Sequence, residues 1–373
     1  MISNKKVAHL TSAHPRYDTR IFIKMCSSLA FDDYDVSLVV ADGKGNEVNN
    51  GVNILDVGAS KGRFDRIRNA PKRVFAKAAA LNADLYHLHD PELIPIGLKL
   101  KRLGKKVFFD AHEDAPEQML SKHYLNYYSR WVISKLLKSY ENYAFPKFDG
   151  LITATPFIKN KLIKLNANTT NINNYPIVGE LSNCDSKSKI RSNSICYIGN
   201  IDTIRGINEL VKSLEFIDEK IELKLAGPYS SNNIRSSLKE LPGWRNIKEY
   251  GLVSRRDVAN IFNQCFAGIV TFHDYPNHRN AQPNKIFEYM SAGLPVIASD
   301  FPLWRKILND NSCGILVDPE DPEDIARAIN YLFLNQEEAR EMGGNGREAI
   351  SEKYNWGFET EKLINFYNDA LTK

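Results

Sequence analysis

The chain of 373 residues is poor in cysteine, and its few cysteines are not grouped. Five are scattered along the sequence without the paired spacing of a zinc ligand set: Cys26, Cys184, Cys196, Cys265 and Cys313. This distribution argues against a disulfide framework and a cysteine-based zinc module, and it indicates a reducing compartment.

Two common phosphate-binding sequences are missing as well. The first loop carries no G-x-G-x-x-G, and no G-x-x-x-x-G-K-[ST] occurs anywhere, so a dinucleotide-binding fold or a P-loop NTPase is poorly supported. No apolar run approaches the length that crosses a bilayer, and residues 1–6 lead into a short strand rather than a signal-peptide core. We therefore expect a cytoplasmic protein that attaches, at most, to a membrane surface.

What remains is typical of a globular protein, with one asymmetry. Hydrophobic residues make up 43% of the chain and charged residues 25%, and the length suffices for two domains. The net charge of +4 divides unevenly, because residues 1–178 hold 26 Lys and Arg against 17 Asp and Glu. A basic half joined to an acidic half predicts different partners for the two.

The order of predicted elements indicates two α/β domains. A strand at residues 7–10 leads through a loop to a helix capped by Asp18, and a second strand follows at 34–40. A similar set starts at residues 195–198. We predict two Rossmann-like, doubly wound domains, with ligands beyond the carboxyl ends of the strands. The expected boundaries are 1–176, 177–355, and a last helix at 356–373 that packs back on the first domain.

Histidines and acids cluster at two predicted strand ends of the first half. Strand alternation places His87 beside His89, before Asp90, and it places Asp110 beside His112. A metal site would need ligands at other spacings, so we expect none, whereas a structural role at a strand end remains open for the first two histidines. His112 is the better functional candidate, because its acidic loop can hold its tautomer or raise its pKa.

Two basic stretches, residues 63–77 and 122–138, also lie in the first half. The second carries four cations, no acid, three tyrosines and Trp131. It fits a surface that meets anionic lipid headgroups, and it also fits an ordinary amphipathic helix that packs Trp131 and Leu136 inward. Nucleic acid is not expected, because no base-reading module accompanies the charge.

The second half contains a phosphate-binding pattern. Pro283 suits the first turn of a helix, and Gly293 suits its end. Lys285 in the first turn opposes the helix dipole unless an anion binds there. A solvated Lys285–Glu288 pair is the alternative. Because Arg205 lies in another loop after a strand, the two cations and the helix N-terminus predict a diphosphate site.

These segments resemble the family 4 glycosyltransferases, which are retaining enzymes with the GT-B fold of two Rossmann-like domains facing across a cleft. Residues 199–206 resemble the family's G-R-x-x-x-x-K-G loop, with Asn200 and Arg205 in place of its two cations. Residues 285–297 resemble the second half of its E-x₇-E motif, with Asn280 at the first Glu and Glu288 at the second. Three N-terminal segments resemble a subgroup of bacterial polysaccharide and O-antigen synthesis: residues 18–22, 89–93 and 110–114.

The resemblance implies transfer of a hexosyl or N-acetylhexosaminyl group from a nucleotide-sugar, with a UDP-sugar favoured. The acceptor would be a hydroxyl of a glycan or of a polyprenyl-diphosphate-linked oligosaccharide, and neither a metal nor another cofactor is expected. The catalytic residues would be His112 and Glu288. The donor-binding set would be Gly199, Asn200, Arg205, Leu252, Val253, Gln282, Asn284, Lys285 and Glu288. The acceptor or sugar side would include His14, Arg20, His89, Asp90 and Glu113.

Two other functions stay open for the same fold. One is a nucleotide-sugar epimerase or a phosphorylase. The other is a non-catalytic partner that binds a nucleotide-sugar, since Asn200 and Asn280 each replace a charged residue of the pattern. We expect the protein at the inner face of the plasma membrane if residues 63–77 and 122–138 bind anionic lipid.

Overall fold

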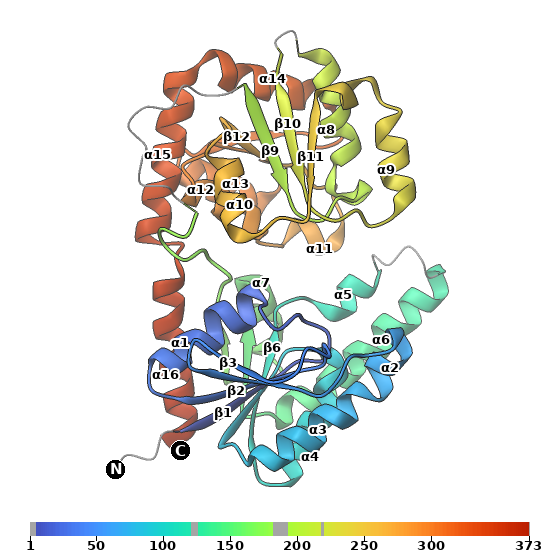
Figure 1. Cartoon of the computed structure of the whole chain (residues 1–373), viewed down its shortest axis with the longest axis vertical. Coiled ribbons are helices and arrows are strands. Elements are labelled where there is room, and N and C mark those ends of the chain that lie inside the picture. Colours follow the sequence, from blue (N-terminus) through green and yellow to red (C-terminus); the bar gives the residue numbers. More distant parts are fainter. Residues whose placement is uncertain (1–4, 121–125, 182–192, 218–219, 373) are drawn as a thin grey trace. The chain divides into compact units, whose positions relative to one another are not determined.

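The computed structural model describes residues 5–120, 126–181, 193–217 and 220–372. The chain forms two compact units (Figure 1). The first comprises residues 1–174 and 358–373, and the second comprises residues 175–357. Both are α/β units built on largely parallel sheets, so the predicted fold class is confirmed.

The first unit holds an eight-stranded sheet in the order β3-β4-β2-β1-β5-β6-β7-β8. All neighbours are parallel except β3 and β4. The strands are β1 (Lys6–Leu10), β2 (Asp35–Val40), β3 (Glu47–Asn49), β4 (Val52–Asp56), β5 (Leu85–Leu88), β6 (Lys106–Ala111), β7 (Gly150–Thr153) and β8 (Thr169–Asn171). The sequence patterns did not predict β3, β4 and β8, because β3 and β8 are three-residue edge strands and β4 follows a tight turn.

The helices of this unit are α1 (Ser27–Phe31), α2 (Gly62–Arg68), α3 (Ala70–Leu81), α4 (Ile94–Arg102), α5 (Ala115–Leu120), α6 (Tyr127–Ala144), α7 (Pro156–Leu162) and α16 (Trp356–Thr372), whose first two residues belong to the second unit. Asp18 begins the first helical segment as predicted, because its carboxylate accepts from the N–H groups of Arg20 and Ile21. That segment is π-helical over Thr19–Cys26 before α1 continues it.

The two faces of this sheet differ in chemistry. Ala8 and Leu10 of β1 join the apolar core beneath α3 and α4. The alternate residue His9 lies on the opposite face, which α16 covers through Tyr367. Phe366 of α16 packs on Phe108 of β6 with ring centroids 4.6 Å apart. The helix therefore buries polar strand residues as well as apolar ones.

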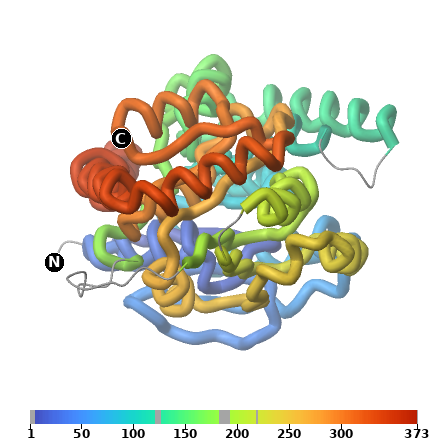
Figure 2. Tube along the Cα trace, turned by 90° about the horizontal axis from the view of Figure 1, so that it is seen from above, coloured from blue at the N-terminus to red at the C-terminus, as the bar shows by residue number. Residues whose placement is uncertain are grey.

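Helix α6 has an exposed apolar face. Seen from two directions (Figures 1 and 2), its first turns extend beyond the other described elements of this unit. Trp131 is 52% exposed and Leu136 is 65% exposed, so the alternative in which both pack inward is wrong. Residues 122–125 of the predicted basic stretch lie outside the described part of the chain.

The second unit holds a six-stranded parallel sheet in the order β11-β10-β9-β12-β13-β14. The strands are β9 (Ser194–Ile198), β10 (Glu222–Ala226), β11 (Ile247–Gly251), β12 (Ala267–Val270), β13 (Val296–Ser299) and β14 (Gly314–Val317). The helices are α8 (Ile207–Ser213), α9 (Asn232–Lys239), α10 (Arg255–Phe262), α11 (Pro276–Arg279), α12 (Asn284–Ser291), α13 (Pro302–Asp310), α14 (Pro322–Leu334) and α15 (Gln336–Glu352). Since β9 and β12 are parallel neighbours, the loops that follow them emerge at one edge of the sheet.

Candidate functional site

The loop after β9 approaches helix α12 closely at Gly199. Its φ of +141° favours glycine, and a Cβ there would lie 2.4 Å from both Cε and Nζ of Lys285. Gly206, with φ +68°, meets the carbonyl oxygen of Thr271, which a Cβ would approach to 1.8 Å. Two glycines of the predicted phosphate loop therefore serve close packing at this edge of the sheet.

Two cations meet on one aromatic ring. Cζ of Arg205 lies 4.7 Å from the ring centroid of the buried Phe272, and Nζ of Lys285 lies 5.5 Å from the same centroid. Nζ of Lys285 also lies 5.4 Å from the ring of Tyr197. Among the described residues, no carboxylate forms an ion pair with either cation. Burial, together with the charge of Arg205, lowers the pKa of Lys285 to about 7.

The N-terminus of α12 opens beside these cations. Pro283 precedes the helix and supplies no side-chain hydrogen bond to the first turn, which Asn284 begins. The indole N–H of Trp304 donates to the carbonyl oxygen of Ala281 at 2.8 Å and so fixes the preceding loop. Oε1 of Gln282 is buried and has no hydrogen-bond partner among the described residues. The loop thus carries donors and an unused acceptor next to two positive charges.

Glu288 has a partner that the sequence patterns did not reveal. Its Oε1 accepts from a terminal nitrogen of Arg255 at 2.6 Å. The same guanidinium donates through Nε and the other terminal nitrogen to both oxygens of Glu180, at 2.8 and 2.9 Å. The predicted alternative, an ion pair between Lys285 and Glu288, is not formed, although the Glu288 charge partly offsets the lowering of the lysine pKa.

The remaining predicted donor residues occupy the surface around this edge. Nδ2 of Asn200 donates to Oγ of Ser230 at 3.0 Å. Leu252, which follows β11, is 82% exposed, while the next residue, Val253, packs partly against the core. The exposed leucine is free to cover an apolar ligand surface.

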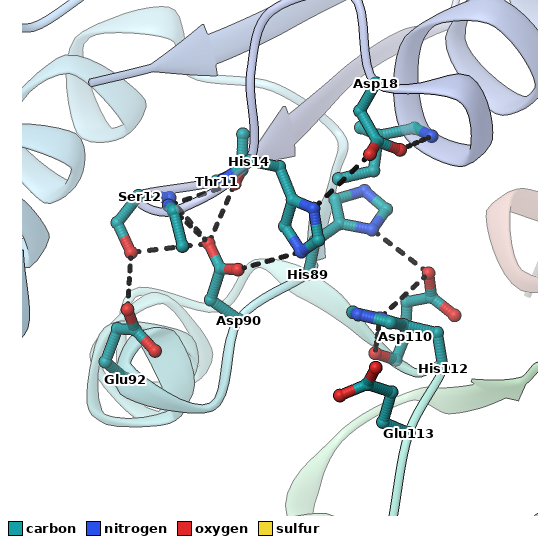
Figure 3. A network of polar contacts seen from close by, with 12 residues as sticks. Thr11, Ser12, His14, Asp18, His89, Asp90, Glu92, Asp110, His112 and Glu113 are labelled. Carbon is teal, nitrogen blue, oxygen red and sulfur yellow. Dashed lines mark hydrogen bonds and ion pairs between the residues drawn. The ribbon is translucent and has the colours of Figure 1, made fainter. Parts of the chain in front are cut away.

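In the first unit, Asp90 is the centre of a polar cluster (Figure 3). One oxygen of this buried carboxylate accepts from Oγ1 of Thr11 at 2.8 Å and from the backbone N–H of Ser12 at 2.6 Å. Its other oxygen faces Nε2 of His14 at 3.3 Å. Burial by itself opposes a charge on His14, but the hydrogen bond to Asp18 and the charge of Asp90 outweigh it and raise its pKa to about 9.

His112 lies beside this cluster, with its ring centroid 5.2 Å from that of His14. Its Nδ1 is 3.3 Å from the backbone oxygen of Asp110 and 3.7 Å from a carboxylate oxygen of the same residue (Figure 3). That carboxylate accepts two hydrogen bonds from Arg20, at 2.8 and 2.7 Å. Nδ1 of His89 lies 3.2 Å from one of its oxygens.

The structure therefore separates the predicted acceptor-side residues into two groups. Arg20 and His89 are buried and contact Asp110, so they lie behind His112 rather than at a surface. His14 and His112 are partly exposed, and Glu113 is exposed, where its carboxylate accepts from Gln118. Asp90 holds the loop of Thr11–His14 in place.

Several residues of both sites were missed from the sequence. Arg255 donates to Glu288 and is itself held by Glu180, while His9 and Tyr367 lie behind His89. Each belongs to a segment distant in sequence from its partner, so spacing carried no signal. The one available clue was the polar residue His9 inside an otherwise apolar strand.

Comparison with known proteins finds a glycosyltransferase family model for each half of the chain. The model for "Glycosyltransferase Family 4" matches residues 19–173, and the model for "Glycosyl transferases group 1" matches residues 184–349. An uncharacterized glycosyltransferase of Methanocaldococcus jannaschii is 25% identical over 69% of this chain and 67% of its own length. The capsular polysaccharide biosynthesis glycosyltransferase CapM of Staphylococcus aureus is 26% identical over 48% of this chain and 46% of its own.

A solved structure shows the same fold along the whole chain. HepE of Anabaena, in complex with UDP-glucose, superimposes with a TM-score of 0.75 at 13% identity, covering 98% of this chain and 99% of its own. At this identity the likeness concerns the arrangement of elements only. It is the arrangement of two Rossmann-like domains called GT-B.

Proposed function

We propose that this chain, a glycosyltransferase of the GT-B type, transfers a sugar from a nucleoside-diphosphate donor to a hydroxyl of a glycan or lipid-linked acceptor. A UDP-sugar is the favoured donor, and retention of the anomeric configuration is the proposed outcome. The UDP-glucose held by HepE supports the donor class, and CapM, a capsular polysaccharide biosynthesis enzyme, supports a role in cell-surface polysaccharide synthesis. Within that role, we propose an O-antigen-type polysaccharide.

The observation that carries the proposal is the pair of cations, Arg205 and Lys285, beside α12, neither of which forms an ion pair with a carboxylate in the described part of the chain. Two positive charges beside exposed backbone N–H groups destabilise one another until an anion enters. Burial lowers the pKa of Lys285 most, and the charge of Arg205 lowers it further. A diphosphate would restore full protonation of Lys285, and the negative charge that builds on it as the sugar departs would be stabilised by Arg205 and Lys285. This chemistry needs no metal.

The rest of the donor fits around the diphosphate. Oε1 of Gln282 and the second oxygen of Glu288 offer acceptors for sugar or ribose hydroxyl groups. The hydrogen bond from Arg255 fixes the orientation of the Glu288 carboxylate, so this acceptor is preorganised. Leu252 would cover one face of the base. Gly199 lets the side chain of Lys285 pack against the loop after β9.

The first unit would supply the remaining groups. His112 presents Nε2 away from Asp110, because its Nδ1 faces the Asp110 carbonyl oxygen, which can only accept. We assign His112 to the developing charge of the sugar or to one of its hydroxyl groups. His14, charged near neutral pH, and Glu113 would contact the acceptor side.

An anionic membrane surface is the partner that α6 favours. Tyr127, Tyr128 and Trp131 are exposed on this helix, next to Arg130 and Lys135. Aromatic side chains beside cations match the headgroup region of an anionic bilayer. Helix α2 adds exposed Phe64 and Ile67 among arginines. Among the described residues, no helix is long and apolar enough to cross a membrane.

The test of the donor site is calorimetry with UDP. Replacing Arg205 with Ala should weaken binding by roughly 10- to 100-fold, because a charge-assisted contact is worth about 1.5–3 kcal/mol. Arg327→Ala is the matched control, since Arg327 is an exposed arginine of the same unit that pairs with Asp324. Equal affinities of wild type and Arg205→Ala would remove Arg205 from the phosphate site.

A turnover assay of Glu288→Ala tests the reaction. The variant should abolish sugar transfer, and near-normal turnover would contradict the proposed role of Glu288 in that transfer.

Two other functions make distinct predictions. An epimerase or a phosphorylase shares the donor site, but an epimerase would convert labelled nucleotide-sugar without any acceptor. A non-catalytic binding partner would bind UDP with no turnover across a panel of acceptors. Asn200 and Asn280 replace two charged residues of the family pattern, and this replacement is the observation that favours a non-catalytic binding partner.

A further inference from the structure

Three histidines and a tyrosine form a buried cluster in the first unit. His9 of β1 lies in register with His87 of β5, and His89 follows the same strand two residues later. All three rings are fully buried beneath α16, which contributes Tyr367. The rings of His9 and His89 are nearly parallel, with an interplanar angle of 16° and centroids 5.1 Å apart.

The four side chains are joined end to end by hydrogen bonds. The hydroxyl of Tyr367 lies 2.7 Å from Nδ1 of His87 and 3.2 Å from Nε2 of His9. Nδ1 of His9 lies 2.9 Å from Nε2 of His89. Nδ1 of His89 lies 3.2 Å from the Asp110 carboxylate. This hydrogen-bond chain thus ends at Asp110, the residue whose oxygens face His112.

The Asp110 end fixes the direction of every donor. The guanidinium of Arg20 keeps this buried carboxylate ionised despite its burial, and a carboxylate only accepts, so His89 donates through Nδ1–H. Burial lowers the pKa of His89 and His9, so both rings are neutral and each uses Nε2 as an acceptor. His9 therefore donates from Nδ1 to His89, and Tyr367 donates its proton to His9.

The same logic settles the far end. Because the Tyr367 proton points to His9, the phenol oxygen accepts from Nδ1–H of His87. Nε2 of His87 then carries no proton. It is buried and has no hydrogen-bond partner among the described residues. An Nε2 without a proton and without a partner fits donation that runs from His87 through Tyr367, His9 and His89 to Asp110. If Tyr367 donated to His87 instead, Nε2 of His87 would carry a buried N–H without an acceptor.

We propose that Tyr367 is a positioning residue that acts through His9 and His89 to orient Asp110, and hence His112. The proposal rests on the role given above to His112. Asp110 is clamped on one side by Arg20 and on the other by the histidine chain. Its backbone and carboxylate oxygens both face Nδ1 of His112. The C-terminal helix thereby contributes to the geometry of a site that none of its residues contacts.

A divalent metal is the competing occupant of the cluster. One nitrogen from each of His9, His87 and His89 lies within 4.8 Å of the others. Ligation would require lone pairs that converge on one point. Nδ1 of His9 and Nε2 of His89 instead face each other at hydrogen-bond distance, and the Tyr367 hydroxyl lies between His9 and His87.

Nitrogen NMR of histidine-labelled protein tests the chain without any substitution. At neutral pH, His9, His87 and His89 should each appear as neutral rings that carry the proton on Nδ1. A ring protonated on Nε2, or on both nitrogens, would overturn the assigned direction. Resonances that shift with added Zn²⁺ and return with a chelator would overturn it in favour of a metal site.

Kinetics of Tyr367→Phe test the positioning role. This variant removes one oxygen and should lower kcat by roughly tenfold, leaving KM for donor and acceptor within about twofold, because the loss is of orientation and not of binding. It should also shift the ring signals of His9 and His87.

Tyr34→Phe is the matched control. The Tyr34 hydroxyl donates to Asn368 of the same helix at 2.8 Å, and it takes no part in the series of hydrogen bonds that joins Tyr367 to the three histidines. Unchanged kcat in Tyr367→Phe, or an equal loss in Tyr34→Phe, would overturn the positioning role. Full activity of His112→Ala would refute the proposed function of His112, while the ring tautomers would still report whether the chain exists.

Discussion

Donor binding should depend on pH through Lys285. In the ligand-free protein, burial and the charge of Arg205 lower the pKa of Lys285 to about 7, so the ammonium is half deprotonated at neutral pH. A bound diphosphate supplies two or more negative charges and returns this pKa toward the ordinary value of about 10.4. Binding must therefore take up a proton wherever the free lysine is neutral and the bound lysine is charged.

The sign and size follow from linkage. Above the free pKa, each unit of pH costs one factor of ten in affinity until the bound pKa is reached. Between pH 7.5 and pH 9 the affinity for UDP should fall by roughly 25-fold, or about 1.9 kcal/mol. This window avoids the second ionisation of the phosphate itself, near about pH 6, which has the opposite sign.

The assay is calorimetric titration with UDP at about pH 8 in buffers of different ionisation enthalpy. We expect uptake of about 0.9 proton per UDP bound. Lys285→Met keeps an unbranched stem in the same space and has no charge to gain. It should bind more weakly at pH 7.5 and lose most of the pH dependence, so the difference between wild type and variant isolates this residue from His14 and other groups.

An affinity that stays constant from pH 7.5 to pH 9 would refute the reasoning, as would equal proton uptake in wild type and Lys285→Met. Either result would mean that Lys285 does not change its protonation when the anion enters. The diphosphate would then have to bind away from the helix N-terminus.

Two further predictions concern the surface of α6 and the close packing of the phosphate loop. The double variant Trp131→Ser, Lys135→Ser should co-sediment less with anionic vesicles at low salt. The control Phe31→Ser, at a residue of the same unit that is 94% exposed, should co-sediment as the wild type does. Vesicle binding that changes neither with the double substitution nor with salt would refute electrostatic attachment. Gly206→Ala should lower the melting temperature of the second unit by several degrees, because a Cβ there meets the Thr271 carbonyl oxygen at 1.8 Å, and such strain costs about 2 kcal/mol or more. Gly344→Ala in α15, with no atom within 4 Å of its new Cβ, should raise that temperature slightly or leave it unchanged, and equal effects of the two would refute the packing argument.

The fold was predictable because its signals are local. Asp18 caps the helix that follows it, and short apolar strands such as Val296–Ser299 need only their own residues to be identified as buried. The sequence also indicated Lys285 and Arg205 as cations near a helix N-terminus, since both follow strands whose ends meet at one edge.

What it could not indicate was how each charged group is compensated. Glu288 has an unremarkable position on a helix, yet Arg255 donates to it from another segment and is itself held by Glu180. Residues 122–138 left two interpretations open, and only the exposure of Trp131 and Leu136 decided against inward packing. Such pairings depend on the meeting of distant segments, for which the spacing along one segment carries no information.

His9 and Tyr367 are the clearest case. They are separated by 358 positions and joined at 3.2 Å. The sequence by itself determined the two α/β units and indicated the loops proposed to bind phosphate and the candidate histidines, because helix caps, strand alternation and glycine turns act over a few residues. Only the tertiary structure decided which polar groups neutralise, orient or leave one another unpaired, because electrostatic and hydrogen-bond energies depend on distances in space that the order of residues does not contain.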